Sequence, residues 1–376
     1  MLDSAENPRG LKGGSAVTEQ NTQSKGREPW IHLYGLTLAE LRTWLEEQGE
    51  PGYRAAQLFD WMYKKRVTSV DAMTNLPKAL RNVLRERARL GTMEELTRQV
   101  SKKDGTTKFL FRLFDGATVE TVLMRHSYGH SVCVSSQVGC HMGCQFCAST
   151  LGGLVRNLEA GEMVEQVLAC QRMLDQQGQR VSSVVVMGSG EPLENYGATL
   201  RFIRLITADE GLRIGQRHIT VSTSGMVPAI RKLAEERLQI TLAVSLHASN
   251  DEVRSRLMPI NRAYPIAVLL EACREYWEKT GRRLTFEYAL IGGINDRLDQ
   301  ADELADRLRG LPCHVNLIPV NYVPERRFDR TPRRQVEAFR ERLERHGISC
   351  TVRREMGADI AAACGQLRAG YELTEA

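Results

Sequence analysis

Short apolar runs alternate with stretches of helical periodicity from Ser131 to His346. This alternation is typical of βα units, in which parallel strands are joined by right-handed helical crossovers. It predicts an α/β fold of about six such units, as a partial barrel or as a doubly wound sheet. The predicted strands are Val132–Val138, Ser182–Met187, His218–Ser222, Ile240–Ser245, Arg283–Leu290 and Cys313–Pro319. The predicted helices are Ala160–Asp175, Ala198–Thr207, Val227–Arg237, Ile266–Thr280, Gln300–Arg309 and Arg333–His346.

The chain before Ser131 has a different pattern. Apolar residues at helical spacing predict a small helical domain, and shorter β-like segments with Asp-Gly turn signals predict a β extension after it. The predicted helices are Thr37–Gln48, Tyr53–Lys65 and Lys78–Leu90, and the predicted strands are Glu95–Val100, Lys108–Leu113 and Ala117–Met124.

These patterns divide the chain into five expected parts. A polar segment rich in Gly, Ser, Asn and Gln, residues 1–28, is expected to be a disordered tail. The helical N-terminal accessory domain follows at 29–92 and the β extension at 93–130. The α/β body then covers 131–350, and a Gly- and Ala-rich C-terminal segment covers 351–376.

Charge is spread unevenly along the 376 residues, although the net charge is only +5. Pro51–Lys108 holds 13 Lys and Arg against 6 Asp and Glu, and Val323–Arg354 holds 10 against 5. Each basic segment fits either a phosphate-binding surface or an ordinary solvated helix face. The first 30 residues lack the apolar core of a signal peptide, so we expect a reducing, cytoplasmic location.

Four of the nine cysteines lie in His126–Val155, a run of 30 residues without Asp, Glu, Lys or Arg. Its Ser, His, Gln and Gly content excludes a membrane span. In a reducing location, clustered cysteines indicate metal or redox chemistry. Cys140, Cys144 and Cys147 follow the first predicted strand, at the functional edge of a βα fold. Three thiolates on one loop suit a 4Fe–4S cluster with one open iron, whereas zinc would require a fourth ligand such as Cys133.

The Cys-x-x-x-Cys-x-x-Cys spacing after a first strand resembles the radical SAM superfamily. Further blocks resemble the RlmN/Cfr family of RNA adenine methyltransferases over about residues 36–367. These blocks are Ser135–Cys140 (SSQVGC), Met187–Leu193 (MGSGEPL), Ser222–Gly225 (STSG), Ser245–Ala248 (SLHA) and Asp359–Leu367. The resemblance implies a partial (β/α)6 radical SAM barrel with the helical domain and the β extension attached.

The resemblance implies an S-adenosylmethionine site at the ends of the predicted strands. Gly190 and Glu191 match residues that bind the amino acid part of this ligand, although the turn alone fits an ordinary βα connection. The family usually has Met where Ser189 stands, which changes neither matched contact. The other matched ligand contacts are Ser222, Ser245, Leu246, His247 and Asn321. Each of these alone is typical of a helix cap or a structural side chain, but together they form a rim.

Three further residues gain a role only from the resemblance. Cys364 matches the cysteine that is itself methylated, Cys133 matches its resolving partner, and Glu120 matches the general base. Alone, Cys364 would be read as a small buried hydrophobe and Glu120 as a solvent-facing strand residue. The remaining four cysteines are expected to pack in the core: Cys170, Cys273, Cys313 and Cys350.

The resemblance implies methylation of adenine carbon 2 in 23S rRNA and in tRNA. One S-adenosylmethionine would methylate Cys364, and a second, bound at the open iron, would be cleaved to a radical that activates this methyl group. An external electron donor of the flavodoxin or ferredoxin type would be needed, and the chain is expected to be a monomer. Methylation at carbon 8, as in the Cfr branch, is the nearest alternative, but Pro192 and Ser224 resemble the RlmN branch. A zinc-bound RNA-binding module without catalysis is the alternative from another class.

Overall fold

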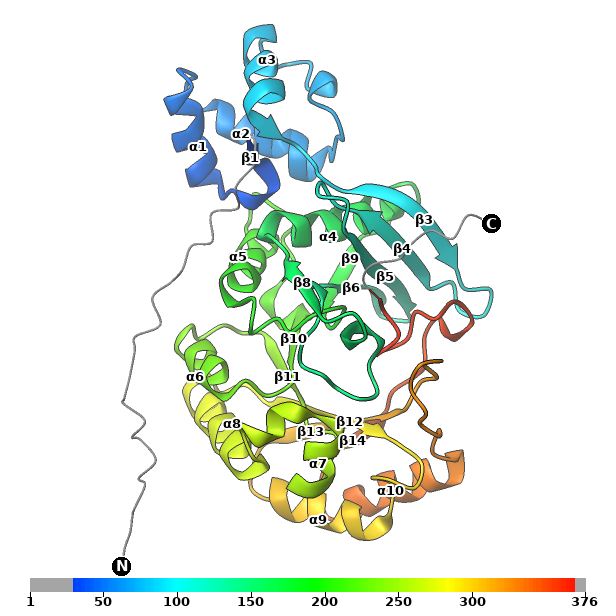
Figure 1. The fold of residues 1–376 in the computed structure, drawn as a ribbon. Helices are drawn as coiled ribbons and strands as arrows, with labels where there is room; N and C mark the ends of the chain where they lie inside the picture. Colours follow the sequence, from blue (N-terminus) through cyan, green and yellow to red (C-terminus); the bar gives the residue numbers. More distant parts are fainter. Residues whose placement is uncertain (1–29, 369–376) are drawn as a thin grey trace, which may run out of the picture.

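The computed structural model describes residues 30–368, so the predicted disordered tail at 1–28 lies outside the described residues, as does the end of the C-terminal segment. Within this range the βα units form one ten-stranded sheet in the order β14-β13-β12-β11-β10-β9-β6-β5-β4-β3 (Figure 1). The strands from β6 to β14 are all parallel, which confirms the predicted α/β class and the barrel-like body. These strands are β6 (Gly129–Val134), β9 (Val181–Val186), β10 (Ile219–Thr223), β11 (Thr241–Ser245), β12 (Leu284–Leu290), β13 (Cys313–Pro319) and β14 (Cys350–Val352).

Helices cover the outer face of the parallel strands (Figure 1). Except for the short helix after β11, their apolar sides join the strand residues in one core, whereas Val253 and Leu257 of that helix pack in a separate apolar cluster. The helices are α4 (Ala160–Asp175), α5 (Tyr196–Thr207), α6 (Val227–Glu235), α7 (Asp251–Leu257), α8 (Ile266–Thr280), α9 (Leu298–Leu308) and α10 (Arg333–Arg345).

The structure corrects the sequence prediction at three places. The first predicted strand, Val132–Val138, is broken: β6 ends at Val134, and β7 (Gln137–Gly139) then pairs with β8 (Leu154–Asn157) instead of with the main sheet. The short strand β14 and the short helix α7 were not predicted. Both are too short and too polar to produce a clear apolar period.

The β extension consists of β3 (Glu94–Val100), β4 (Thr107–Arg112) and β5 (Thr118–His126), which form an antiparallel meander. The predicted turns at Asp104-Gly105 and Asp115-Gly116 are present, with φ of 73° and 84° at the two glycines. Strand β5 pairs with β6, so the extension is continuous with the barrel sheet.

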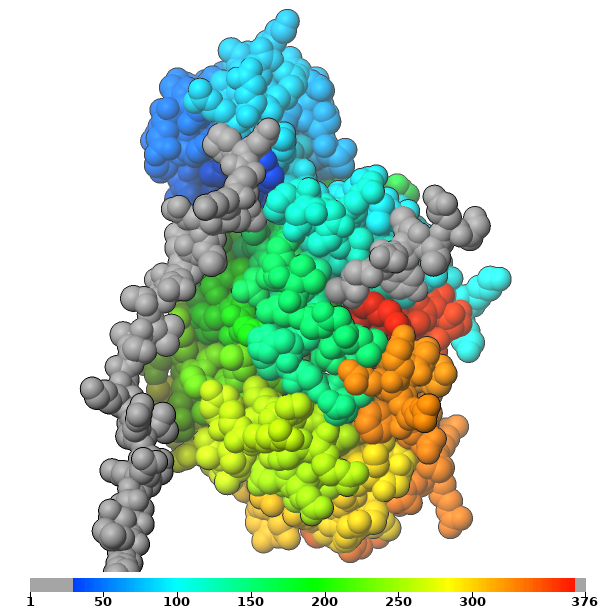
Figure 2. All heavy atoms as spheres, viewed as in Figure 1, coloured from blue at the N-terminus to red at the C-terminus, as the bar shows by residue number. Residues whose placement is uncertain are grey.

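The helical N-terminal unit forms a lobe at one end of the molecule (Figure 2). Its helices are α1 (Leu38–Glu47), α2 (Arg54–Phe59) and α3 (Lys78–Arg87), and the turn Asp60–Lys64 extends α2 with a wider, π-type turn. Helix α1 begins with a capping box between Thr37 and Glu40. No helix in residues 30–368 is long and apolar enough to cross a membrane.

A buried ion pair joins this lobe to the barrel. His32, on the short strand β1 (Ile31–His32), places Nε2 2.7 Å from Oε1 of Glu165 on α4. Gly161 allows this approach, because a Cβ there would lie 2.4 Å from His32 Nδ1. Burial opposes the charge on His32, but Glu159 and Glu165 outweigh it and raise its pKa to about 9.

We expect this pair to make stability depend on pH. Because the folded pKa of His32 lies above the unfolded value of 6.5, its stabilisation is complete below about pH 6.5 and is lost as pH rises through about 9. His32→Gln should therefore lower the free energy of unfolding by about 3 kcal/mol near pH 6 and by much less near pH 10. Urea unfolding of both proteins across this range measures the difference, and a pH-independent difference would contradict the pairing.

Candidate active site

A cavity of about 970 Å³ lies at the carboxyl ends of the parallel strands. The three loop cysteines and most of the predicted ligand contacts face it together, although they come from six separate parts of the chain. Of the predicted site residues, those that line it are Cys140, Cys144, Cys147, Gly190, Glu191, Ser222, Ser245, His247, Asn321 and Cys364. The structure thus brings most of the predicted rim residues to this edge of the sheet, while the role of each residue stays a prediction.

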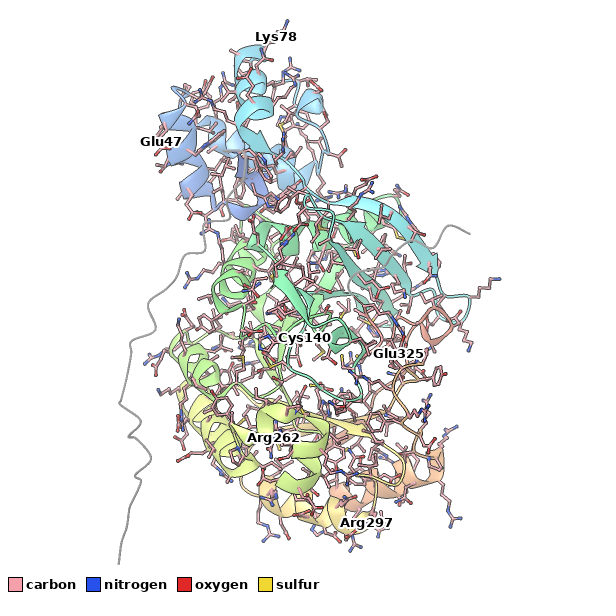
Figure 3. The ribbon with its side chains drawn as sticks, viewed as in Figure 1. Glu47, Lys78, Cys140, Arg262, Arg297 and Glu325 are labelled. Carbon is pink, nitrogen blue, oxygen red and sulfur yellow. The ribbon has the colours of Figure 1, made fainter. Side chains whose placement is uncertain are left out.

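The cysteine loop begins directly after β7 and ends before β8, the two strands of the small separate sheet (Figure 3, Cys140). The turn needs glycine at Gly139, which has φ of 76° and whose added Cβ would collide with the Gly153 carbonyl. Burial raises the pKa of the Cys140 thiol to about 12 and also raises those of Cys144 and Cys147. In residues 30–368 no three Cys, His, Asp or Glu side chains are grouped so that they could hold a single metal ion. The thiols nevertheless share one cavity wall, as ligands of a larger inorganic cluster must.

Glu191 forms a buried carboxylate in the same cavity. Its oxygens accept hydrogen bonds from the backbone N–H groups of Leu193 (3.0 Å) and Ser224 (2.7 Å). Burial nevertheless raises the pKa of Glu191. Gly190 has φ of 108°, and a Cβ there would lie 2.6 Å from that of Gln137, so this turn requires glycine. A buried carboxylate beside an open backbone suits a ligand with an ammonium group.

His247 is held as a neutral side chain. Burial, with a smaller effect of Arg254, lowers its pKa to about 3. Its Nδ1 accepts a hydrogen bond from the Ala289 N–H (2.9 Å), which leaves the ring proton on Nε2 as a donor. Leu246 does not line the cavity: it is buried, and its N–H donates to the Glu287 carbonyl. Its carbonyl accepts a hydrogen bond from Arg254 Nε (3.1 Å), so the predicted contact of Leu246 with a ligand stays a prediction.

A second cavity adjoins the first and contains Cys133. Cys364 lines both cavities, as do Met187, Asn321 and Arg353. Burial, followed by the nearby Cys364, raises the pKa of the Cys133 thiol to about 12, and the charge of Arg353 acts in the opposite direction. Cys133 does not line the first cavity with the loop cysteines, which gives no support to the alternative of a zinc site completed by Cys133.

The segment that carries Cys364 crosses the barrel between the β extension and the loop after β13 (Figure 2, red). The segment is held at Cys364 and at residues after it. Asn321 donates to the Cys364 carbonyl (2.9 Å), and the Ala148 N–H donates to the Gly365 carbonyl (2.7 Å). Arg368 forms an ion pair with Glu325 (2.6 Å; Glu325 is labelled in Figure 3). Cys364 is thus held beside the cysteine loop.

Glu120 lines neither of these cavities. It lies on β5, two residues before Val122, whose partner on β6 is Cys133. Side chains two residues apart point to the same face of a strand, so Glu120 lies on the Cys133 face. There its Oε2 accepts a hydrogen bond from the Arg368 N–H (2.7 Å), and its Oε1 lies 3.0 Å from Lys108 Nζ.

Sequence reasoning missed two cationic residues at this site. Arg353 lies between the cavities, with Nη1 3.8 Å from Glu287 Oε2 and 3.7 Å from Met187 Sδ. Arg254 is fully buried, and its guanidinium donates to the carbonyls of Leu246, Ser245 and Ser224 behind the first cavity. Both lie among other charged residues in the sequence. Only their burial in the folded structure distinguishes them from ordinary surface arginines.

Two family models match the chain. That of the ribosomal RNA large subunit methyltransferase N-terminal domain matches residues 31–90, and that of the radical SAM superfamily matches residues 134–308. A relative from Bacillus pumilus, named probable dual-specificity RNA methyltransferase RlmN, is 57% identical over 353 residues, covering 94% of this chain and 98% of that protein. The chain belongs to the RlmN family. A relative of the same name from Geobacillus thermodenitrificans is 59% identical over 341 residues, covering 91% and 93% of the two chains.

The fold agrees with a solved structure. A radical SAM methyltransferase from Sphaerobacter thermophilus superposes with a TM-score of 0.88 and 51% identity, over 90% of this chain and 99% of that one. The family resemblance and the radical SAM barrel inferred from the motifs are thereby confirmed, and the chain has the overall architecture of an RlmN-family protein.

The two thiols around Cys364 should differ in reactivity. Cys133 is 7% exposed and its pKa is raised to about 12, so it is protonated at neutral pH, whereas Cys364 is less buried and faces both cavities. Iodoacetamide should alkylate Cys364 about tenfold faster than Cys133 near pH 7.5 in the protein without iron or S-adenosylmethionine. Peptide mass spectrometry over time measures both rates, with the core residue Cys273 as an unreactive internal control. Faster alkylation of Cys133 would contradict the described packing.

Proposed function

We propose that this chain methylates carbon 2 of an adenine in 23S rRNA, at the peptidyl transferase centre, and in tRNA, 3′ of the anticodon. The observation that carries the proposal is the position of Cys364, which faces both the cavity of the three-cysteine loop and the cavity of Cys133. The relatives are named dual-specificity RNA methyltransferases, which supports two RNA substrates.

The first cavity has the donors that the proposed cofactors need. Cys140, Cys144 and Cys147 would hold one 4Fe–4S cluster, and the buried Glu191 carboxylate beside Gly190 would take the ammonium group of S-adenosylmethionine. The neutral His247 offers an Nε2 donor, and Ser222, Ser245 and Asn321 complete the polar lining of the cavity. Cluster and S-adenosylmethionine together supply the radical chemistry that an unactivated methyl C–H bond requires.

The residues of the chain would carry and release the methyl carbon. The Cys364 sulfur first takes a methyl group from a sulfonium, and its carbon, once activated, bonds to the adenine. Glu120 takes the proton from the ring carbon as general base. The Cys133 sulfur then attacks the Cys364 sulfur, which breaks the carbon–sulfur bond and leaves a disulfide. The released carbon takes up a proton to become the methyl group, and the one remaining electron would be accepted by the cluster. Since Cys133 and Cys364 line the same cavity as free thiols, this exchange needs no large movement of β6.

RNA would bind across the helical lobe and the barrel rim. Helix α3 lies in the accessory domain at 29–92, which we propose binds RNA, and carries Arg85 and Arg87 in its last turn, although Arg85 pairs with Asp71. The basic stretch Arg326–Arg345 is less available than its composition suggests, because Arg340 pairs with Glu344 and Arg342 with Asp302. We propose a cytoplasmic monomer that receives electrons from an external flavodoxin or ferredoxin type of donor.

Analysis of the modified nucleoside distinguishes methylation at carbon 2 from methylation at carbon 8. Expressed in cells that lack their own adenine-C2 methyltransferase, the chain should restore 2-methyladenosine to both 23S rRNA and tRNA, measured by nucleoside chromatography with mass spectrometry. The matched control is Cys364→Ala, which removes the methyl carrier and should abolish the product. Recovery of 8-methyladenosine would assign the alternative activity, and an active Cys364→Ala variant would refute the proposed carrier.

The resolving role of Cys133 gives a second prediction. Cys133→Ala should stop the reaction after the carbon bond to adenine has formed, so the purified protein should carry RNA covalently through Cys364. Nuclease digestion followed by peptide mass spectrometry would identify this adduct. The Cys133→Ala/Cys364→Ala double variant and the single variant Cys313→Ala should be free of RNA. Cys133→Ala protein without bound RNA, purified from cells in which the parent chain is active, would contradict the resolving role of Cys133.

A further inference from the structure

A buried cation lies against the proposed base. Lys108 and Glu120 come from neighbouring strands β4 and β5, where Lys108 is paired with Val122 and Glu120 with Leu110. The two side chains therefore meet diagonally across the strand pair. Lys108 Nζ lies 3.0 Å from Glu120 Oε1, and the side chains are only 11% and 3% exposed.

The same ammonium contacts the segment that carries Cys364. Lys108 Nζ donates a hydrogen bond to the Ala361 carbonyl (3.3 Å), three residues before Cys364. Ala361 has φ of 49°, a left-handed conformation that costs a non-glycine residue free energy and needs support from its surroundings. The other oxygen of Glu120 accepts from the Arg368 N–H, four residues after Cys364. Lys108 and Glu120 thus hold the Cys364 segment from both ends.

Stability alone gives little reason for such a pair. Burying two charges costs about as much as their attraction returns, and an apolar replacement of both is often neutral. A buried pair does, however, restrict geometry more tightly than an exposed one. Each of the two Lys108 contacts involves a part of the proposed chemistry, the base on one side and the methyl-carrying segment on the other.

We propose that Lys108 is a positioning residue that orients the Glu120 carboxylate relative to the Cys364 segment. This inference rests on the proposed function, in which Glu120 takes the proton from adenine. Methylation of the Cys364 sulfur does not use Glu120, so it does not require Lys108. Methylation of RNA therefore tests the role of Lys108, and methylation of Cys364 tests the proposed function.

The test compares Lys108→Met with Lys108→Arg. In Lys108→Met, Cys364 should still gain its methyl group, detected as one added methylene on the Cys364 peptide, while methylation of RNA falls by about 100-fold. Lys108→Arg keeps a cation and should recover at least about a tenth of the parent rate. Lys279→Met is the matched control, because it removes a Lys–Glu pair on the protein surface and should leave both half-reactions unchanged.

A double variant tests whether Lys108 acts through Glu120. Lys108→Met added to Glu120→Gln should cause no further loss of RNA methylation, since residues that act as a unit are not additive. Parallel loss of both half-reactions in Lys108→Met and Lys108→Arg would mean a structural role and overturn the proposal, as would unchanged RNA methylation. A parent chain that never methylates Cys364 would instead overturn the proposed function.

Discussion

The site depends on the two different pairings of β6. On one edge Cys133 pairs with Val122 of the antiparallel extension, and on the other with Val185 of the parallel barrel. Parallel strands need cover on both faces, and α4 covers one face of β6. In residues 30–368 the C-terminal segment covers the other face, as Met356, Ala362 and Leu367 pack with Cys133. The same apolar contact that buries β6 therefore brings Cys364 to Cys133.

Polar contacts from distant parts of the chain fix this covering segment. Asp104, in the β3–β4 turn, accepts from the Gly357 N–H (2.9 Å), and Asp359 accepts from Ser101 Oγ (2.7 Å). At the other end, Ser149 beside the cysteine loop donates to the Leu367 carbonyl (2.7 Å). The segment has little regular structure of its own, so its conformation is set by these contacts. The β extension thus has a structural purpose in the site beyond lengthening the sheet.

The parts of the fold that were predictable have a strong local pattern. Helices Ala160–Asp175 and Ile266–Thr280 have the predicted bounds, since each has an apolar stripe over four turns or more. The break between β6 and β7 was not predictable, because Ser135 and Ser136 are polar but fully buried. Ser135 Oγ donates to the Glu120 carbonyl and accepts from the Ser189 N–H, contacts over 15 and 54 residues that no local pattern encodes.

The candidate site also has residues that could be predicted from the sequence and residues that could not. Residues within short motifs could be assigned by resemblance, and the structure gathers most of them around one cavity. Lys108, Arg254 and Arg353 could not be assigned from the sequence. A lysine or arginine is usually solvent-exposed, and the residues that these three contact lie elsewhere in the chain. Lys108 reaches a residue 253 positions away, which only the folded chain reveals.

These cations offset charges that the site must bury. Burial disfavours thiolates, as the raised pKa values of Cys140, Cys144 and Cys147 show, yet metal ligation requires the deprotonated sulfur. Arg254 lies behind the cavity wall and lowers the pKa of Cys144 against this trend. In residues 30–368 it forms no ion pair with a carboxylate, and carbonyl groups satisfy its donors, so its charge is not cancelled. Arg353 has the corresponding effect on Cys133. Arg326 acts in the same direction on Cys147. Arginines from three different parts of the chain therefore oppose the burial that disfavours the thiolates of Cys144, Cys147 and Cys133.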